Sequence, residues 1–463
     1  MFSYVDYLWP AKEGLIPFNH QKITTEFALG YKRAFILNDM GTGKTLSSLW
    51  ACDLLFEAKR IRKVLIVSPL STMRSVWQKE IFYNMPHRRS AIAHGNRAQR
   101  LAAISSPVHF VIINHDGIKT CADELVREAF DIIIIDELTA FKSMQSERTK
   151  MMAYVTAPSR AKAVWGLTGE PTPNSPLEAY SQCKVVNPLN PHLPRYYTQF
   201  RDATMYQVND YMWLPKEGAS DIVHRCMQPA IRFRREDCID LPPTMYQTIS
   251  VEFTKEQTEH YNRMKQEAYI LHDKGEISAS SAAIVLNKLL QISAGAVKTN
   301  DGNIAHIDYK SRFDALLEIL EQTPQKKLVV FATYVATIKR LLNDLLEKNI
   351  NTAAIFGDVD HKLRAQHIDN FQTGDLSVLI LQPQSSAHGI TLVASSTIVW
   401  FSLIPSNELY RQGNARIVRP GQTRTTFIIH MVSSPAEQHI ANILERKGNM
   451  SDEVLGLFKQ HQI

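Results

Sequence analysis

Short hydrophobic runs alternate with longer helix-like patterns along most of the chain. In the first half these runs are continuous and rich in β-branched residues, and they occupy residues 34–37, 64–67, 108–113, 132–135 and 164–167. Continuous runs of this length are typical of strands that are buried on both faces of a parallel sheet. Between the first two runs, leucines recur near helical spacing at Leu46, Leu49, Leu54 and Leu55. The first half therefore predicts alternating strands and helices.

The second half repeats this pattern. Its hydrophobic runs occupy residues 328–332, 353–356, 378–381, 398–401 and 427–431. The helical patterns between them cover residues 314–321, 335–347, 361–371 and 407–417. Alternation of strand and helix on this scale predicts the α/β class with mostly parallel sheets. Two such units in one chain predict two lobes with a cleft between them.

The middle of the chain, about residues 176–310, interrupts the alternation. It carries several prolines, and its helical patterns lie at residues 256–271 and 279–292. We therefore expect helical insertions at about residues 176–230 and 255–310, around a linker near residues 234–241. The expected domains are an N-terminal lobe over residues 1–236 and a C-terminal lobe over residues 237–463.

Composition narrows the class of protein. A chain of 463 residues is too long for one ordinary domain, and 44% hydrophobic with 21% charged residues is typical of globular chains. These values exclude a chain that is mainly disordered, collagen-like or coiled coil. The five cysteines are odd in number and form no C-x-x-C pair, so neither a disulfide framework nor a zinc site is indicated. With no secretory leader and no long apolar run, we expect a cytoplasmic protein with no membrane partner.

The clearest chemical motif is NDMGTGKT at residues 38–45, between a predicted strand and a predicted helix. A phosphate-binding loop needs glycines so that the backbone turns tightly and directs its N–H groups at the anion, and Gly41 and Gly43 meet this need. Lys44 supplies a cation for the β- and γ-phosphates, and Thr45 supplies a hydroxyl for Mg²⁺. These residues predict a nucleotide-binding loop.

A second pair of residues strengthens that prediction. The strict phosphate-loop pattern has glycine where this chain has Asn38, and an ordinary glycine turn would also explain the motif. However, Asp136 and Glu137 directly follow a predicted buried strand, at the strand end where open α/β sheets place ligands. Hydrolysis of a nucleoside triphosphate needs one carboxylate near Mg²⁺ and another to polarise the attacking water. Asp136 suits the first role and Glu137 the second.

A third motif, QGNARIVRPGQ at residues 412–422, lies in the other predicted lobe. Arg416 and Arg419 are three residues apart, so on a helix they share a face. Two cations presented across a cleft can neutralise charge that develops on a γ-phosphate. On its own, the same spacing is typical of a basic surface helix.

In this order, the motifs resemble those of superfamily-two helicase-type ATPases, specifically the Swi/Snf-related DNA translocases of the compact prokaryotic or phage type. Residues 19–21, NHQ, resemble the glutamine motif that reads adenine, and Thr139 and Glu170 depart from the family pattern. Further segments similar to family motifs are residues 65–70, 77–80, 136–139, 167–174, 234–235, 241–243, 327–331 and 385–392. The resemblance runs along nearly the whole chain.

The resemblance implies two RecA-like lobes with parallel sheets flanked by helices, and helical insertions around the interlobe linker. It implies ATP and Mg²⁺ as cofactors, with Thr45 and Asp136 holding the metal. The implied catalytic residues are Lys44, Glu137, Arg416 and Arg419. The implied nucleotide-binding residues are Gln21, Gly41, Thr42, Gly43, Lys44, Thr45, Asp136, Gly389 and Gln412.

Three functions stay open at this point. The resemblance favours an ATP-driven motor that moves along double-stranded DNA, and the alternatives are a strand-separating or branch-migrating helicase in recombination or repair, and a non-catalytic nucleic-acid-binding scaffold. The net charge of 52 − 46 = +6 permits a nucleic-acid partner without requiring one. For the motor we expect sequence-tolerant contacts to the backbone of duplex or branched DNA, a recruiting protein, and a bacterial or phage-infected cell as the setting.

Overall fold

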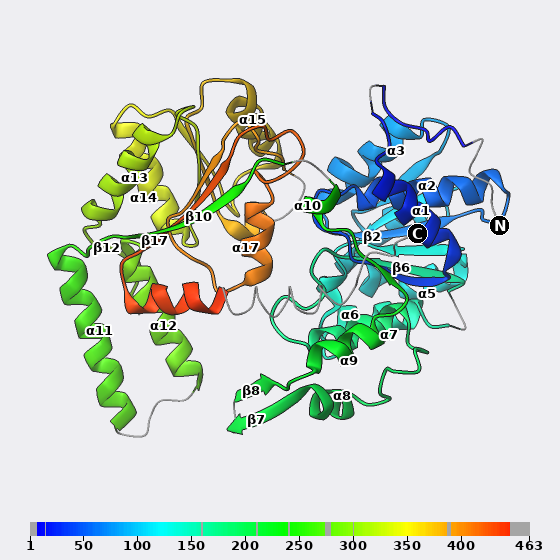
Figure 1. Cartoon of the computed structure of the whole chain (residues 1–463), viewed down its shortest axis with the longest axis horizontal. Helices are drawn as coiled ribbons and strands as arrows, with labels where there is room; N and C mark the ends of the chain where they lie inside the picture. Colours follow the sequence, from blue (N-terminus) through cyan, green and yellow to red (C-terminus); the bar gives the residue numbers. More distant parts are fainter. Residues whose placement is uncertain are drawn as a thin grey trace. The chain divides into compact units, whose positions relative to one another are not determined.

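The computed structural model describes residues 7–13, 15–158, 161–209, 212–238, 241–273, 279–299, 301–386 and 390–444. The chain divides into two compact units, with the boundary between Asp240 and Leu241. Each unit is built on a parallel sheet of its own, with helices packed against it (Figure 1). The predicted α/β class with two parallel sheets flanked by helices is confirmed.

The first unit holds a seven-stranded sheet. Its strands are β1 (Arg33–Ile36), β2 (Val64–Ser68), β3 (Ser90–Ala93), β4 (Phe110–Asn114), β5 (Ile132–Ile135), β6 (Ala163–Leu167) and β9 (Ala230–Ile231). They lie in the order β3-β4-β2-β5-β6-β1-β9, and all neighbours pair in parallel. The five predicted strands are all present. The edge strands β3 and β9 are not predicted, because β3 is only partly buried and β9 has just two residues.

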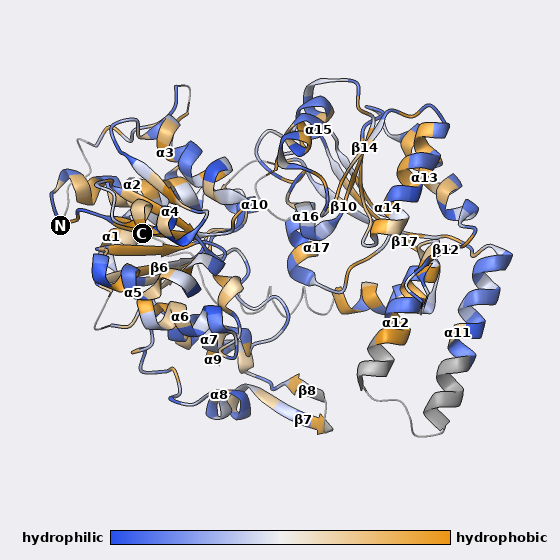
Figure 2. Ribbon diagram, turned by 180° about the vertical axis from the view of Figure 1, so that it is seen from behind, coloured by the Kyte–Doolittle hydropathy of each residue, from blue (hydrophilic) through white to orange (hydrophobic). Residues whose placement is uncertain are grey.

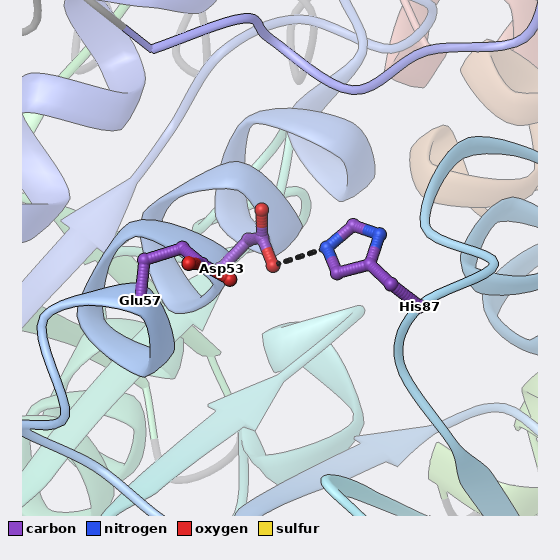
Figure 3. A group of neighbouring side chains, drawn as sticks. All are labelled: Asp53, Glu57 and His87. Atoms are coloured by element: carbon purple, nitrogen blue, oxygen red, sulfur yellow. Dashed lines mark hydrogen bonds and ion pairs between the residues drawn. The ribbon is translucent and has the colours of Figure 1, made fainter.

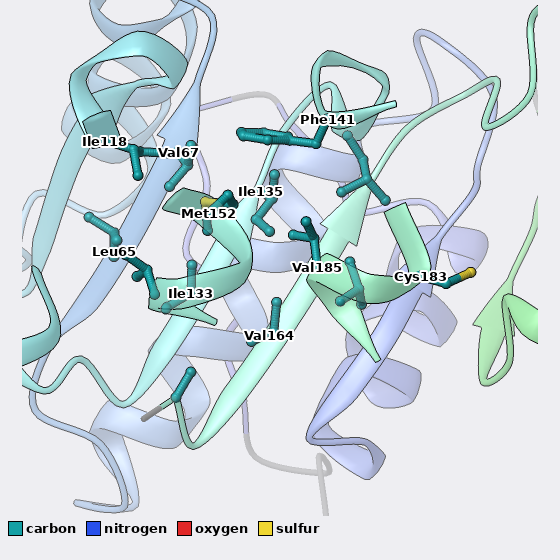
Figure 4. Packing of buried hydrophobic residues seen from close by; sticks show 14 of the residues in the cluster. Leu65, Val67, Ile118, Ile133, Ile135, Phe141, Met152, Val164, Cys183 and Val185 are labelled. Atoms are coloured by element: carbon teal, nitrogen blue, oxygen red, sulfur yellow. The ribbon is translucent and has the colours of Figure 1, made fainter. Parts of the chain in front are cut away.

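Alternate residues of the central strands point to opposite faces of this sheet. Leu65 and Val67 of β2 pack in one hydrophobic cluster, and Ile66 between them packs in the other. Figure 4 shows the first of these clusters, in which Phe141 and Met152 cover the strands. Burial on both faces explains why the sequence shows continuous hydrophobic runs in place of an alternating pattern.

Helices cover this sheet. They are α1 (Asn19–Gly30), α2 (Lys44–Glu57), α3 (Lys79–Asn84), α4 (Arg97–Ile104), α5 (Ile118–Glu128), α6 (Glu147–Val155), α7 (Glu178–Val186), α8 (Tyr197–Thr204), α9 (Ala219–Cys226) and α10 (Arg235–Cys238). The insertion predicted at about residues 176–230 contains α7, α8 and α9. It also contains an antiparallel hairpin of β7 (Met205–Asn209) and β8 (Met212–Pro215), which the sequence pattern does not predict.

The second unit holds a six-stranded parallel sheet. Its strands are β10 (Thr244–Ser250), β13 (Leu328–Phe331), β14 (Thr352–Ile355), β15 (Val378–Leu381), β16 (Thr397–Trp400) and β17 (Thr426–Val432). They lie in the order β10-β17-β16-β13-β15-β14. The five predicted strands are present, and only the edge strand β10 is new. Its residues are mostly exposed, so it lacks the continuous hydrophobic run that marks the others.

Helices flank the second sheet as well. They are α11 (Lys255–Asp273), α12 (Ala279–Ser293), α13 (Lys310–Gln322), α14 (Val335–Glu347), α15 (His361–Thr373), α16 (Pro383–Ser386) and α17 (Asn407–Asn414). The insertion predicted at about residues 255–310 contains α11, α12 and a small hairpin of β11 (Ala296–Lys298) and β12 (Ile304–His306). Figure 2 shows hydrophobic strands between helices of mixed hydropathy in both units. None of the helices in the described ranges combines the length and hydrophobicity needed to cross a membrane.

Candidate nucleotide site

The predicted phosphate loop and the predicted carboxylate pair lie at the same edge of the first sheet. The loop follows β1, the carboxylates follow β5, and β6 lies between these two strands. Because all three strands run in parallel, their carboxyl ends meet at one edge. The charges of Glu137 and Asp136 raise the pKa of the Lys44 ammonium against the effect of burial, as expected for groups that this edge brings near one another.

The two glycines of the phosphate loop have backbone conformations that favour glycine. Gly41 has a φ of 85° and Gly43 a φ of 82°, both in the left-handed region. Gly43 caps the start of α2, and Thr45 is half-buried in the first turn of this helix. A Cβ atom on Gly43 would lie 2.0 Å from Nε2 of Gln21. The loop therefore turns tightly into a helix N-terminus, as a phosphate-binding loop requires.

Helix α1 packs directly on the loop through its first residues. Nε2 of His20 lies 2.8 Å from the carbonyl oxygen of Thr42, and Nε2 of Gln21 donates to the same oxygen at 3.4 Å. Oε1 of Gln21 accepts the backbone N–H of Phe18 at 3.0 Å. Burial lowers the pKa of His20. A neutral imidazole that faces a carbonyl must carry its proton on Nε2, so His20 fixes the loop, a role that the sequence motif does not indicate.

The ammonium of Lys44 closes the loop on itself. Nζ donates to the carbonyl oxygens of Asn38 at 2.7 Å and Asp39 at 3.0 Å. Burial lowers the pKa of Lys44, and the neighbouring carboxylates Glu137, Asp136 and Asp39 oppose this effect. The lysine thus lies where a phosphate oxygen would compete with two carbonyl oxygens for its protons.

Asn38, where the strict pattern has glycine, connects three segments. Its side chain is almost fully buried; Nδ2 donates to Oγ1 of Thr24 at 2.8 Å, and Oδ1 accepts the backbone N–H of Phe233 at 3.0 Å. The neighbouring Asp39 accepts from the backbone N–H of Arg235 at 3.1 Å and pairs with Arg232 at 3.2 Å. Asn38 and Asp39 therefore join the phosphate loop to α1 and to the segment that leads into α10.

The carboxylate of Asp136 is held by two donors. Nε1 of Trp77 donates to Oδ2 at 2.8 Å, and the backbone N–H of Glu137 donates to Oδ1 at 3.1 Å. Nε2 of His115 lies 2.8 Å from the carbonyl oxygen of Asp136. Glu137 has a φ of 49°, a left-handed conformation that is strained for a residue other than glycine. The surrounding hydrogen bonds hold the Asp136 carboxylate next to this strained turn.

The segment that follows β6, the strand between β1 and β5 in the sheet, also contacts the phosphate loop. The backbone N–H of Thr168, just after β6, donates to the carbonyl oxygen of Ile36 at 3.1 Å. A Cβ atom on Gly169 would lie 3.3 Å from the backbone nitrogen of Met40. The segment over residues 167–174, which is similar to a family motif, thus lies against the phosphate loop.

The second unit corrects one expectation. The sequence predicts a helix over residues 407–417 and places Arg416 and Arg419 on one helical face, but α17 ends at Asn414 and both arginines lie in the turn that follows. The turn still brings them together, because Arg416 and Arg419 both donate to the carbonyl oxygen of Ile390, at 3.4 Å and 2.8 Å. The chain leaves the helix in a tight turn, in which the backbone N–H groups of Arg416 and Ile417 donate to the carbonyl oxygens three residues earlier, those of Gly413 and Asn414.

Two other predicted residues belong to this part of the second unit. Gln412 is buried on α17, and its backbone carbonyl accepts from Nε of Arg416 at 2.9 Å. Gly389 lies outside the residues that the structure describes. Gln412, Arg416 and Arg419 therefore form one local group next to Ile390.

A second cluster of possible metal ligands has a different explanation. The ligand atoms of Asp53, Glu57 and His87 lie within 4.8 Å of one another (Figure 3). However, the Asp53 carboxylate already accepts from Tyr7 Oη at 2.8 Å and from Nε of Arg88 at 2.6 Å, and Arg88 also pairs with Glu57. The Arg88 guanidinium supplies the positive charge here, so the cluster is an ion-pair network that fastens α2 to its neighbours.

Family models match both halves of the chain. A model described as the SNF2-related domain matches residues 20–298, and one described as the helicase conserved C-terminal domain matches residues 311–421. The first match alone covers more than half of the 463 residues.

Several curated proteins and solved structures are similar. Protein p41 of Acyrthosiphon pisum secondary endosymbiont phage 1 is 25% identical, over 94% of this chain and 96% of its own length. Human DNA annealing helicase and endonuclease ZRANB3 is 23% identical over 95% of this chain, and human DNA repair and recombination protein RAD54-like is 24% identical over 91%. The chain spans 40% and 62% of these two human proteins. The Sulfolobus solfataricus SWI2/SNF2 ATPase core in complex with dsDNA is 19% identical, with a TM-score of 0.47 over 97% of this chain and 95% of that one.

The phosphate loop, the carboxylate pair and the ordered motifs of two α/β units define an ATPase of helicase superfamily two. The chain belongs to the SNF2-related family. The resemblance seen in the sequence is thereby confirmed, and with it the use of ATP as substrate.

Proposed function

We propose that the protein is a DNA-dependent ATPase that couples ATP hydrolysis to movement along double-stranded DNA. The observation that carries the proposal is the meeting of Lys44, Asp136 and Glu137 at one edge of the first sheet. A lysine for phosphate, a carboxylate for Mg²⁺ and a carboxylate for water are the parts that phosphoanhydride hydrolysis needs.

In this proposal the residues of the first unit have separate roles. The loop residues Gly41, Thr42 and Gly43 enclose the phosphates at the start of α2, and Lys44 exchanges its two carbonyl acceptors for phosphate oxygens. The Thr45 hydroxyl and the Asp136 carboxylate are hard oxygen donors of the kind that Mg²⁺ prefers, so this set fits the metal. Glu137 polarises the attacking water, and Gln21 on α1 reads the adenine.

The second unit contributes Gln412, Arg416 and Arg419, and Gly389 belongs to the same proposal by its motif. Both arginines donate to the carbonyl oxygen of Ile390. In the proposal, a γ-phosphate takes the place of this oxygen and is a stronger acceptor because it is charged. We assign them the neutralisation of charge that develops on the γ-phosphate during hydrolysis.

Duplex DNA is the proposed track. Support comes from the relatives, because one solved SWI2/SNF2 core is described in complex with dsDNA and the human relatives are named for DNA repair, recombination and annealing. Movement along DNA requires contacts to the backbone in place of base readout, so binding is expected to tolerate sequence. A particular DNA structure, such as a branch, or a recruiting protein then provides specificity. The similarity to a phage protein supports the cytoplasm of a bacterial or phage-infected cell as the setting.

The experiment that tests this function compares ATPase rates without nucleic acid and with single-stranded, duplex and branched DNA. It is combined with two strand assays: displacement of a triplex-forming strand, and unwinding of a forked duplex. Stimulation by duplex DNA with triplex displacement and no fork unwinding is the expected result. Efficient fork unwinding would overturn the translocase and support the strand-separating helicase. DNA binding without ATP turnover would support the non-catalytic scaffold. Lys44→Ala is the negative control, and full turnover in that variant would overturn the phosphate-loop assignment.

A further inference from the structure

The first unit contains three tryptophans that are at most 1% exposed and that each donate one indole N–H. Trp50 donates to the carbonyl oxygen of Pro10 at 2.8 Å, and Trp165 to that of Tyr31 at 3.0 Å. Trp77 instead donates to a side-chain carboxylate, Oδ2 of Asp136, at 2.8 Å. The first two bonds go to main-chain carbonyl oxygens, whereas the third reaches the site.

The position of the Trp77 ring is fixed by its surroundings. The ring is fully buried and packs in the hydrophobic cluster that contains Met73 and Ile81. It lies in a π-helical turn, Met73–Gln78, between β2 and α3. Such turns are rare and occur frequently at functional sites, because the wider turn redirects the side chains it carries. A buried ring in this turn holds its N–H in one direction.

The bond from Trp77 completes a pair of donors on one carboxylate. Trp77 binds Oδ2 and the backbone N–H of Glu137 binds Oδ1, so each oxygen of Asp136 accepts a hydrogen bond from a fixed donor. Two donors on opposite oxygens fix the plane of the carboxylate, and each oxygen keeps lone-pair capacity for another partner. Hydrogen bonds to a charged acceptor are stronger than bonds between neutral groups.

We propose that Trp77 is a positioning residue for magnesium–nucleotide binding: its indole N–H orients the Asp136 carboxylate toward the metal. This inference rests on the proposed function, in which Asp136 holds Mg²⁺. Trp77 is fully buried, so we expect it to act through Asp136. Loss of the N–H should therefore weaken the metal-dependent part of nucleotide binding and leave the metal-independent part unchanged.

The test uses the full-length protein, Trp77→Phe, and Trp165→Phe as a matched control. Both variants remove one indole N–H from a fully buried ring in the same unit. The readout is the affinity for a fluorescent β,γ-imido analogue of ATP, measured in EDTA and across a range of free Mg²⁺. For Trp77→Phe we expect unchanged affinity in EDTA and a rise of about 10- to 100-fold in the Mg²⁺ concentration that gives half of the metal effect. Trp165→Phe should leave both values unchanged.

Two further measurements keep the outcomes distinct. Asp136→Asn tests the proposed function itself: if it leaves the Mg²⁺ dependence unchanged, the assignment of Asp136 fails and the Trp77 inference fails with it. If Asp136→Asn shifts the Mg²⁺ dependence but Trp77→Phe behaves like Trp165→Phe, only the inference about Trp77 is overturned. If Trp77→Phe does not fold, benzothienylalanine at position 77 replaces the indole N–H by sulfur in a ring of the same shape. The same loss of Mg²⁺ response is expected for it, and a normal response would overturn the inference.

Discussion

Glu137 shows how much of this site depends on single residues. Its backbone has a left-handed φ of 49° that few side chains adopt, and its N–H is bound to Oδ1 of Asp136. A strained conformation of this kind persists only where the surrounding structure enforces it. The proposed function gives the two adjacent carboxylates different tasks, one toward the metal and one toward water.

Replacement of Glu137 by glutamine should separate binding from hydrolysis. The amide keeps the size of the side chain but cannot accept a proton from water, so we expect the turnover number to fall about 10²- to 10⁴-fold. The affinity for ATP should be retained, because the phosphate contacts of the loop are untouched. Single-turnover hydrolysis and equilibrium nucleotide binding measure the two effects. Glu147→Gln, at an exposed position in the same unit, is the control, and normal turnover in Glu137→Gln would exclude Glu137 as the water-activating group.

Gly43 allows an equally direct comparison. Alanine at this position would have a left-handed φ and a Cβ atom 2.0 Å from Nε2 of Gln21, so it strains the loop and displaces the glutamine. A left-handed conformation costs about 1–2 kcal/mol for alanine, so nucleotide affinity should fall by about tenfold or more. Gly30→Ala is the matched control, because nothing lies within 4 Å of a Cβ added there. Equal nucleotide dissociation constants in both variants would contradict the proposed role of the loop.

Elements differ in how well the sequence predicts them. The central strands are predicted because burial on both faces demands continuous hydrophobic runs. The edge strands β3, β9 and β10 and the hairpins of β7 with β8 and of β11 with β12 are missed, because their residues are partly exposed or the strands have only two or three residues. The expected helix over residues 407–417 is too long, since the chain turns after Asn414 through hydrogen bonds that span three residues.

The site divides in the same way. Local motifs predict Lys44 and Glu137, because their chemistry needs a short spacing that the sequence shows. The positions of Asn38, His20 and Trp77 depend on contacts between distant segments, such as the bond from Trp77 to Asp136 across 59 residues of chain. Only the fold reveals these contacts.

A contact between α17 and β17 predicts a pH effect in the second unit. Oη of Tyr410 lies 2.8 Å from Nε2 of His430, and burial lowers the pKa of His430 from 6.5 to about 4. The neutral imidazole accepts a hydrogen bond from the tyrosine hydroxyl. As the pH falls below 6.5, the unfolded chain binds a proton that the folded His430 refuses until about pH 4, so stability decreases in this window and levels off below it. The expected loss is at most about 3 kcal/mol.

The measurement is urea unfolding of the protein at a series of pH values within this window. In the double variant His430→Leu/Tyr410→Phe both polar partners are removed, so the free energy of unfolding should depend less steeply on pH than in the unmodified protein. An identical pH dependence in the two proteins would show that His430 does not remain neutral on folding.

At the scale of the whole molecule, the net charge and the share of each relative that the chain spans both bear on the proposed function. The excess of +6 over 463 residues does not by itself identify a nucleic-acid partner, and the proposal of DNA rests on the family and on relatives named for DNA repair. The chain spans 96% of the phage protein but only 40% of human ZRANB3, so the function argued for this chain is that of the motor and not of the larger proteins.

A motor that grips the DNA backbone should bind through electrostatics. Each phosphate neutralised by lysine or arginine releases a counterion, so the logarithm of the binding constant should fall linearly with the logarithm of salt concentration. With several phosphate contacts, we expect the dissociation constant for duplex DNA to rise by about tenfold or more between about 50 and about 200 mM salt. Duplexes of equal length and unrelated sequence should bind alike at any one salt concentration, because backbone contacts carry no base information. Fluorescence anisotropy with both series measures these effects. Salt-independent binding, or a strong preference for one sequence, would mean that the protein contacts the bases and not the backbone. A motor that must move past every sequence cannot depend on such contacts, so this result would contradict the proposed motor.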